Sequence, residues 1–140
     1  MYLNNLPMPP SLNSCYMPLP NGGRCRSQSY KDFQKAFNQW AIDNYLDINA
    51  CRASLKGIFQ IGLVLTFSLP RGILITKKGT VKRWDSSNRI KVIEDALSEA
   101  LNLDDCLIWD VRAIKRIGDK DYPQITANFC ILDSLYYGII

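Results

Sequence analysis

Apolar side chains recur three and four residues apart in two segments of the chain, and this spacing predicts two amphipathic helices. We expect the first helix to begin at a Ser27 or Ser29 cap and to end at about Leu46. Its apolar positions are Phe33, Ala36, Phe37, Trp40 and Ala41. The second helix, over about residues 86–101, has one apolar stripe formed by Ile90, Ile93, Ala96, Leu97, Ala100 and Leu101.

Four other segments have the pattern of β-strands. Residues 1–6 are short and apolar and end at Pro7. Residues 58–69 are rich in β-branched and aromatic side chains and end at Pro70. A last strand is predicted over residues 124–132. Residues 106–116 alternate between apolar and polar side chains, which predicts a half-buried strand whose inner face carries Leu107, Trp109, Val111 and Ala113.

The order β-α-β-α-β-β predicts an α+β fold in which two helices pack on one mixed β-sheet. The 140 residues fit a single domain over residues 1–140. Residues 7–26 are rich in Pro, Asn, Gly and Ser, so we expect a long surface loop there, and residues 71–84 predict a mobile loop or hairpin. The segment LYYGII at residues 135–140 is expected to extend a strand or to form a dimer contact.

The net charge of +4 is mild, but the charges are unevenly distributed. Residues 85–110 contain seven acids. Residues 71–83 contain no acid and five cations, which are Arg71, Lys77, Lys78, Lys82 and Arg83. A basic segment beside an acidic one suits a protein that holds phosphates and also holds a cation with which to cut them.

The chain contains no histidine, which excludes His-dependent catalytic triads, two-His zinc sites and His general bases. The five cysteines are odd in number and include no CxxC pair, so they predict reduced thiols in a cytoplasmic protein. No segment reaches the roughly 18 apolar residues that span a membrane. The first residues also lack the pattern of a signal peptide. We therefore expect no membrane partner.

Polar side chains gather at the start of the second helix. At about 100° per residue, Asn88, Lys91 and Asp95 share one side of the helix, away from the apolar stripe, and Asp85 precedes the helix. One interpretation is structural: Asp85 caps the helix, and Lys91 pairs with Asp95 on a solvated face. The other interpretation is a functional site, in which two carboxylates, an amide and an amine lie together.

Two further acids, Asp104 and Asp105, precede the strand predicted at residues 106–116. Adjacent acids at the start of a strand are commonly just a turn signal. If this strand packs beside the second helix, however, Asp105 can approach Asp85, and a divalent cation would relieve their repulsion. Mg²⁺ binds to one or two carboxylates together with waters and a substrate phosphate. A nearby lysine would stabilise the charge that develops on phosphorus.

Several motifs occur in a specific order. Residues 6–13 (LPMPPSLN) contain Pro-x-Pro-Pro-Ser-x-Asn, and residues 24–30 form a polar entry to the first helix. Residues 85–91 (DSSNRIK) follow the pattern Asp-x-Asp-Asn-x-x-Lys, with Ser87 at the second acidic position. The pair Asp104-Asp105 comes next. Together these motifs cover most of residues 6–115 and resemble the RusA family of Holliday junction resolvases.

The resemblance implies a homodimeric endodeoxyribonuclease of bacterial or phage origin that resolves four-way DNA junctions in recombination and repair, without a small-molecule cofactor. Asp85 and Asp105 would bind Mg²⁺, or Mn²⁺ in its place, and Lys91 would lie beside the scissile phosphate. Asn88 would support this site, as would Asp104, which we also count among the metal ligands. DNA binding is expected at Arg71, Lys77, Lys78, Lys82, Arg83, Asn13 and Arg24.

Ser87 departs from the family motif, which usually has a third catalytic carboxylate at this position. A serine reaches a metal only weakly, through its hydroxyl or a water, so we expect Ser87 to be a weak ligand that Asp95, or less readily Glu94, supplements. The alternative function is therefore a junction-binding protein with weak or no cleavage activity. An RNA-binding domain is disfavoured, because the chain lacks an aromatic RNP-like strand and a GXXG loop.

Overall fold

A computed structural model describes residues 1–132, so the expectation for residues 135–140 lies outside the described part of the chain. Its main sheet has four strands in the order β1-β6-β4-β5. The strands are β1 (Tyr2–Leu3), β4 (Ile61–Leu69), β5 (Ile108–Ile117) and β6 (Gln124–Ile131). Strand β4 is parallel to β5 and antiparallel to β6. The α+β class with a mixed sheet is thus confirmed.

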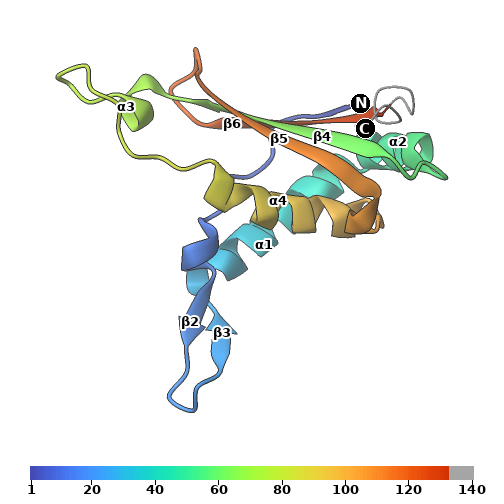
Figure 1. Cartoon of the computed structure of the whole chain (residues 1–140), viewed down its shortest axis with the longest axis horizontal. Helices are drawn as coiled ribbons and strands as arrows, with labels where there is room; N and C mark the ends of the chain where they lie inside the picture. Colours follow the sequence, from blue (N-terminus) through green and yellow to red (C-terminus); the bar gives the residue numbers. More distant parts are fainter. Residues whose placement is uncertain (133–140) are drawn as a thin grey trace, which may run out of the picture.

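The two long helices, α1 (Gln28–Asp43) and α4 (Ser87–Ala100), pack on one face of this sheet (Figure 1). Helix α2 (Tyr45–Leu55) follows α1, and the short helix α3 (Arg71–Leu74) lies beyond one end of the sheet, directly after β4. The central strand β4 points Leu63, Leu65 and Phe67 into the core, where all three are fully buried. Helix α1 covers them with Phe33 and Phe37, and α4 does so with the buried part of its apolar stripe, which comprises Ile93, Leu97 and Leu101. Both predicted helices therefore pack as their periodicity indicates.

The first predicted helix is in fact two helices. Ser27 caps α1 and accepts a hydrogen bond from the Tyr30 backbone N–H, as one of the two predicted caps. The helix ends at Asp43, however, because Asn44 leaves the helical conformation and returns its side-chain amide to the Trp40 carbonyl at 2.8 Å. Helix α2 then begins at Tyr45, within the last residues of the predicted helix, and continues through residues 47–55, where no element was predicted.

Two strands also differ from the prediction. Strand β1 has only two residues, because Asn5 adopts a left-handed conformation with φ of 56°. In β5, Trp109 is 54% exposed rather than facing the core. The pairing register between β4 and β5 shifts here, from Ile61 opposite Ile108 to Gly62 opposite Asp110, and Trp109 is the additional residue. A bulge of this kind turns one side chain away from the regular alternation.

The predicted loop at residues 7–26 is largely structured. It contains a short 3-10 turn, η1 (Leu12–Ser14), and an antiparallel hairpin of β2 (Tyr16–Pro18) and β3 (Arg24–Arg26). Residues 71–84 begin with α3 and continue as a hairpin, in which Ile75 bridges Val81 and Gly79 turns the chain at φ +83°. None of the five cysteines forms a disulfide; Cys15 and Cys51 are buried, Cys25 is partly buried, and Cys106 and Cys130 are exposed. Within residues 1–132 no helix is both long enough and apolar enough to cross a membrane.

Candidate active site

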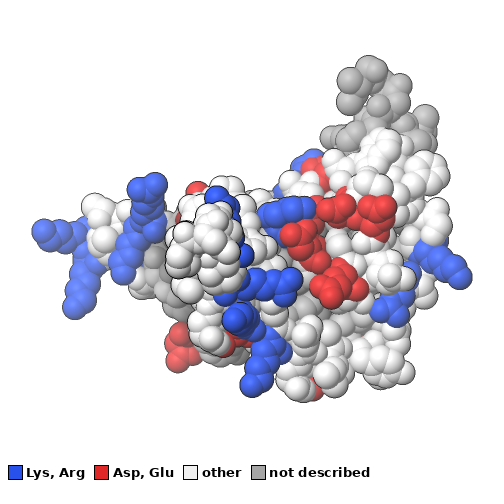
Figure 2. Space-filling view, turned by 90° about the horizontal axis from the view of Figure 1, so that it is seen from below, with Lys and Arg blue, Asp and Glu red and all other residues white. Residues whose placement is uncertain are grey.

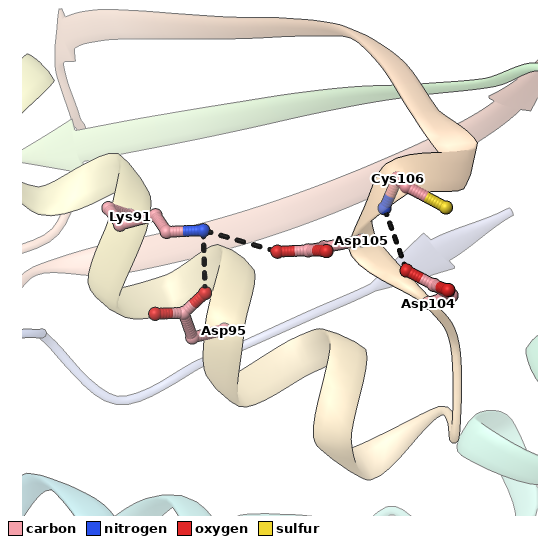
Figure 3. Close-up of polar contacts among 5 residues, drawn as sticks. All are labelled: Lys91, Asp95, Asp104, Asp105 and Cys106. Atoms are coloured by element: carbon pink, nitrogen blue, oxygen red, sulfur yellow. Dashed lines mark hydrogen bonds and ion pairs between the residues drawn. The ribbon is translucent and has the colours of Figure 1, made fainter.

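The Lys91 ammonium lies between two carboxylates (Figure 3). Its Nζ is 2.9 Å from Asp95 Oδ1 and 3.3 Å from Asp105 Oδ2. Lys91 and Asp95 are one turn apart on α4, whereas Asp105 comes from the 3-10 turn η2 (Asp105–Leu107) that precedes β5. The hydrogen bond that Lys91 donates to Asp95 is the main cause that raises the pKa of Lys91; desolvation lowers this pKa, and the hydrogen bond to Asp105 raises it further. Lys91 is therefore a fixed cation beside the two acids.

The two adjacent acids before β5 have different roles in the fold. Asp104 caps η2, where its Oδ1 accepts a hydrogen bond from the Cys106 backbone N–H at 3.0 Å. The bonds from the Cys106 thiol and backbone lower the pKa of Asp104. With Asp104 held in this turn, Asp105 points back towards Lys91. Of the predicted pair, Asp105 thus joins the lysine directly, and Asp104 shapes the turn that presents it.

Asp85 lies just before α4 and is held by Ser87. Its Oδ1 accepts hydrogen bonds from the Ser87 hydroxyl at 2.5 Å and from the Ser87 backbone N–H at 2.9 Å. These bonds lower the pKa of Asp85, with further contributions from the Asn88 backbone and the charge of Lys115. Lys115 itself reaches over from β5 and donates to the Trp84 carbonyl at 2.9 Å. Asp85 is therefore ionised at neutral pH and lies in a positive environment.

Exposed carboxylates next to a fixed cation match the hard oxygen ligands that a hydrated Mg²⁺ prefers. A shallow hollow beside Lys91 is lined by four acids, Asp95, Glu99, Asp104 and Asp105, which we call the acidic patch. Figure 2 shows red side chains gathered on this face. Within residues 1–132, no three Asp, Glu or Cys side chains are close enough to form a complete metal cage. The residues thus fit a metal that keeps waters and takes a phosphate oxygen, rather than one enclosed by protein.

Residues 7–127 match the profile of the endodeoxyribonuclease RusA family. The chain belongs to the RusA family. The match covers most of the chain and contains every predicted metal and catalytic residue. No curated protein sequence matches the chain. Because this family consists of endodeoxyribonucleases, the family match supports a nuclease as the class of enzyme.

In the segment that matches the family motif, the side chain of Ser87 points towards Asp85, the first acid of the motif. Ser87 donates its hydroxyl hydrogen to Asp85, at the position where the family motif usually has a carboxylate. Asp95 lies one helical turn after Lys91 on α4 and forms an ion pair with it. Glu94 is partly buried, and this desolvation raises its pKa, which favours its neutral form relative to the other acids. Of the two acids expected to supplement Ser87, Asp95 thus contacts Lys91 and Glu94 is partly buried.

The predicted DNA-binding residues lie in two separate projections. Arg71 belongs to α3, and Lys77 and Lys78 extend from the hairpin after it, which projects from one end of the molecule (Figures 1 and 2). Arg83 is exposed nearby, whereas Lys82 donates to the Gly72 carbonyl at 2.6 Å. Asn13 and Arg24 lie in η1 and the β2–β3 hairpin. The two basic projections are thus separated rather than joined in one surface.

Sequence reasoning missed Arg89, which ties the N-terminal motif to the start of α4. Its Nη1 donates to the Pro9 carbonyl at 2.5 Å, and its guanidinium carbon lies 4.8 Å from the centre of the Trp84 ring. Burial lowers its pKa. No periodicity in the sequence indicates this contact, because it joins residues 80 positions apart.

Proposed function

We propose that the chain is a Mg²⁺-dependent endodeoxyribonuclease that resolves four-way DNA junctions by paired phosphodiester cleavage. The observation that carries this proposal is the convergence of Lys91, Asp95 and Asp105 from α4 and η2 within the RusA family match. A cation held between acids at the surface is of little use for stability. It is useful where a phosphate and a metal must bind side by side.

Each residue of the proposed site has a distinct role. Asp85 and Asp105 would hold Mg²⁺, with Mn²⁺ as the alternative metal, and Asp104, Ser87 and Asn88 would keep them in place. When bound, the metal supplies a Lewis acid for the phosphate and lowers the pKa of its water. Lys91 would be placed against the scissile phosphate, where its charge offsets the negative charge that develops as the new bond forms.

The rest of the proposal concerns DNA and the second subunit. The basic projections would hold backbone phosphates, which position a protein on DNA without reading its sequence. Two strands of a junction must be cut, so we propose a homodimer with one site in each subunit. Sedimentation should then give twice the chain mass of 16.0 kDa. A cytoplasmic location, where recombining DNA is accessible, is part of the same proposal.

A labelled four-way junction, incubated with and without Mg²⁺, tests the proposal directly. We expect paired cuts with Mg²⁺, none in EDTA, and none in a linear duplex of the same sequence. Asp85→Asn and Asp105→Asn should each abolish cleavage and leave junction binding intact, because removing an acid does not weaken contacts with phosphates. Asp119→Asn, an exposed acid in the turn between β5 and β6, is the matched control.

The alternative, a junction-binding protein with little cleavage, is favoured by the serine at position 87 and by the lack of a three-acid cage in the described residues. Binding without cuts, at any Mg²⁺ or Mn²⁺ concentration, would establish it. Near wild-type cleavage by Asp85→Asn or Asp105→Asn would instead remove that residue from the site.

A further inference from the structure

The β2–β3 hairpin forms an arm, residues 15–26, that projects from the helical side of the molecule (Figure 1). It is a sheet of its own, apart from the main sheet. A tight turn closes its tip: Leu19 N–H donates to Gly23 at 2.7 Å, and Gly22 N–H returns to Leu19 at 3.1 Å. Gly22 provides the left-handed residue of this turn at φ +85°. The tip is therefore well defined despite its exposure.

The base of the hairpin arm is fixed to the body of the protein. Tyr16 packs on Tyr30 of α1 with ring centres 5.6 Å apart, and the Arg26 guanidinium carbon lies 5.7 Å from the centre of that Tyr30 ring. Arg26 also donates to Gln34 at 3.2 Å. At the start of the arm Cys15 is fully buried. An isolated two-stranded hairpin is only marginally stable in water, so these contacts are what hold the arm in one direction.

The tip of the hairpin arm is apolar, although it faces solvent. Met17 is 51% exposed and Leu19 is 39% exposed, and Pro18 and Pro20 beside them are exposed too. Met17 lies in β2, and Leu19 lies directly after the end of β2 in the turn that closes the arm. Exposed apolar side chains at the end of a projection have no core to enter in this chain, and they indicate a surface that binds something.

The charges around this tip favour a nucleic acid as the partner. Residues 1–31 contain no Asp or Glu, and the strand opposite Met17 carries Arg24 and Arg26, both exposed. Apolar Met, Leu and Pro side chains flanked by cations are the group that DNA-bending proteins insert between bases while the cations hold phosphates.

The arm also stands beside the proposed cleavage site. A groove between α1 and α4 begins at the base of the arm and reaches the acidic patch, and its polar lining includes Arg26, Tyr30, Gln34, Asp95 and Glu99. The charge of Asp95 contributes to the raised pKa of Tyr30, for which burial is the main cause. DNA whose phosphate lies at Lys91 would therefore pass close to the arm.

We propose that the hairpin arm enters the branch point of the DNA substrate, where Met17 and Leu19 pack against bases that have left the stack and Arg24 and Arg26 hold the adjoining phosphates. Bases at a branch point have lost neighbours on one side, so less stacking must be broken there than within a duplex. This inference rests on the proposed function, because it assumes a branched DNA substrate.

The test is the fluorescence of 2-aminopurine, which increases when the base unstacks. Four-way junctions carry the probe at the branch point or in the middle of an arm, and binding is measured in EDTA. Wild-type protein should increase fluorescence at the branch point alone. Met17→Ser/Leu19→Ser should abolish that increase and lower the preference for junction over duplex roughly tenfold. Leu46→Ser/Phe59→Ser, at side chains 72% and 67% exposed elsewhere on the surface, should change neither.

Several results would overturn the inference. The first is an undiminished fluorescence increase with Met17→Ser/Leu19→Ser. The second is no increase with wild type together with loss of dimer mass in that variant, which would assign the arm to a protein contact. Cleavage in Mg²⁺ is measured separately. Cuts without an increase in fluorescence would support the proposed nuclease activity and contradict the role of the arm. An increase without cuts would support the role of the arm and contradict the nuclease activity. Wild-type protein that binds no junction contradicts both.

Discussion

At the scale of single residues, Lys91 contributes little to the stability of the fold but is held between two carboxylates. Its two ion pairs, to Asp95 and Asp105, join side chains that are about 50% exposed. Exposed pairs of this kind contribute roughly 0–1 kcal/mol to stability. The reason for this arrangement therefore lies in what the ammonium can bind, and not in the free energy of folding.

Lys91→Met accordingly should lower the cleavage rate by about 10²–10³-fold, the decrease typical when one fixed donor to the developing charge is removed. The melting temperature and the affinity for the junction should change little. Single-turnover cleavage, calorimetry and a binding titration measure the three quantities. If Lys91→Met instead unfolds and shows no effect on the cleavage rate beyond that loss of fold, the purely structural interpretation of the Lys91–Asp95 pair would be correct.

Ser87 sets the protonation of Asp85, and this can be measured without any DNA. Ser87→Ala removes the hydroxyl bond that is the largest cause of the lowered pKa of Asp85, so that pKa should rise towards its ordinary value. Because the folded pKa lies below the unfolded one, the stabilisation is present above the unfolded pKa and is lost as pH falls through the folded value. Ser87→Ala should thus lower the stability at neutral pH, and this difference from wild type should disappear as the pH falls well below about 4, where Asp85 is protonated in both proteins.

The measurement is an NMR titration of the Asp85 carboxyl carbon in both proteins. Ser86→Ala is the matched control, since Ser86 makes no side-chain capping bond to the helix. A carboxyl titration that is the same in wild type and Ser87→Ala would show that the serine does not hold Asp85 in solution.

At the scale of elements, Arg89 joins α4 to the N-terminal Pro segment. It donates to Pro9 and stacks on Trp84, while its Nε is buried and makes no hydrogen bond in the described structure. Arg89→Met keeps the length of the side chain but removes the cation and its donors. We expect the free energy of unfolding to fall by roughly 1–3 kcal/mol, given the hydrogen bond to a charged group and the cation–π contact.

Urea denaturation measures this decrease, and Arg83→Met, at an exposed cation next to Trp84, is the control that should cost little. If Arg89→Met is as stable as wild type, the segment at Pro9 is held by apolar packing alone. The same variant should also weaken cleavage, because the start of α4 carries both Asp85 and Lys91.

At the scale of the whole molecule, one group of basic side chains projects at the end of the face shown in Figure 2, apart from the acidic side chains, whereas other basic side chains border the acidic ones. The hairpin after α3 carries Lys77 and Lys78 far from the acidic patch, which suits a DNA backbone that crosses the site and leaves it at one end.

Lys77→Ala/Lys78→Ala should weaken junction binding and reduce the slope of log Kd against log salt by about one for each phosphate that the variant no longer binds. Lys56→Ala, at the end of α2, should leave the slope unchanged; an unchanged slope in the double variant would show that this hairpin does not touch DNA.

Local interactions determined the parts of this protein that the sequence could predict. The stripe of α4 and the apolar run of β4 were correct, because the periodicity of buried side chains follows directly from helix and strand geometry. The charged motifs also indicated the family, since their order along the chain needs no tertiary information. The bulge at Trp109 was not predicted, because it depends on how β5 pairs with β4. The break at Asn44 was also missed, although the hydrogen bond from its side chain to the Trp40 carbonyl is local.

Only the tertiary structure decided which polar groups meet. The sequence analysis expected Asp105 to bind the metal and Asp104 to support the site, but it could not show the contacts of either acid. The turn η2 makes Asp104 a cap and directs Asp105 to Lys91, which is 14 positions away. The same is true of Arg89 and Pro9, and of the residues predicted as a loop that form the hairpin arm. Such contacts join residues that are distant along the chain, and they depend on how the helices and sheet pack, so no local pattern of residues carries them.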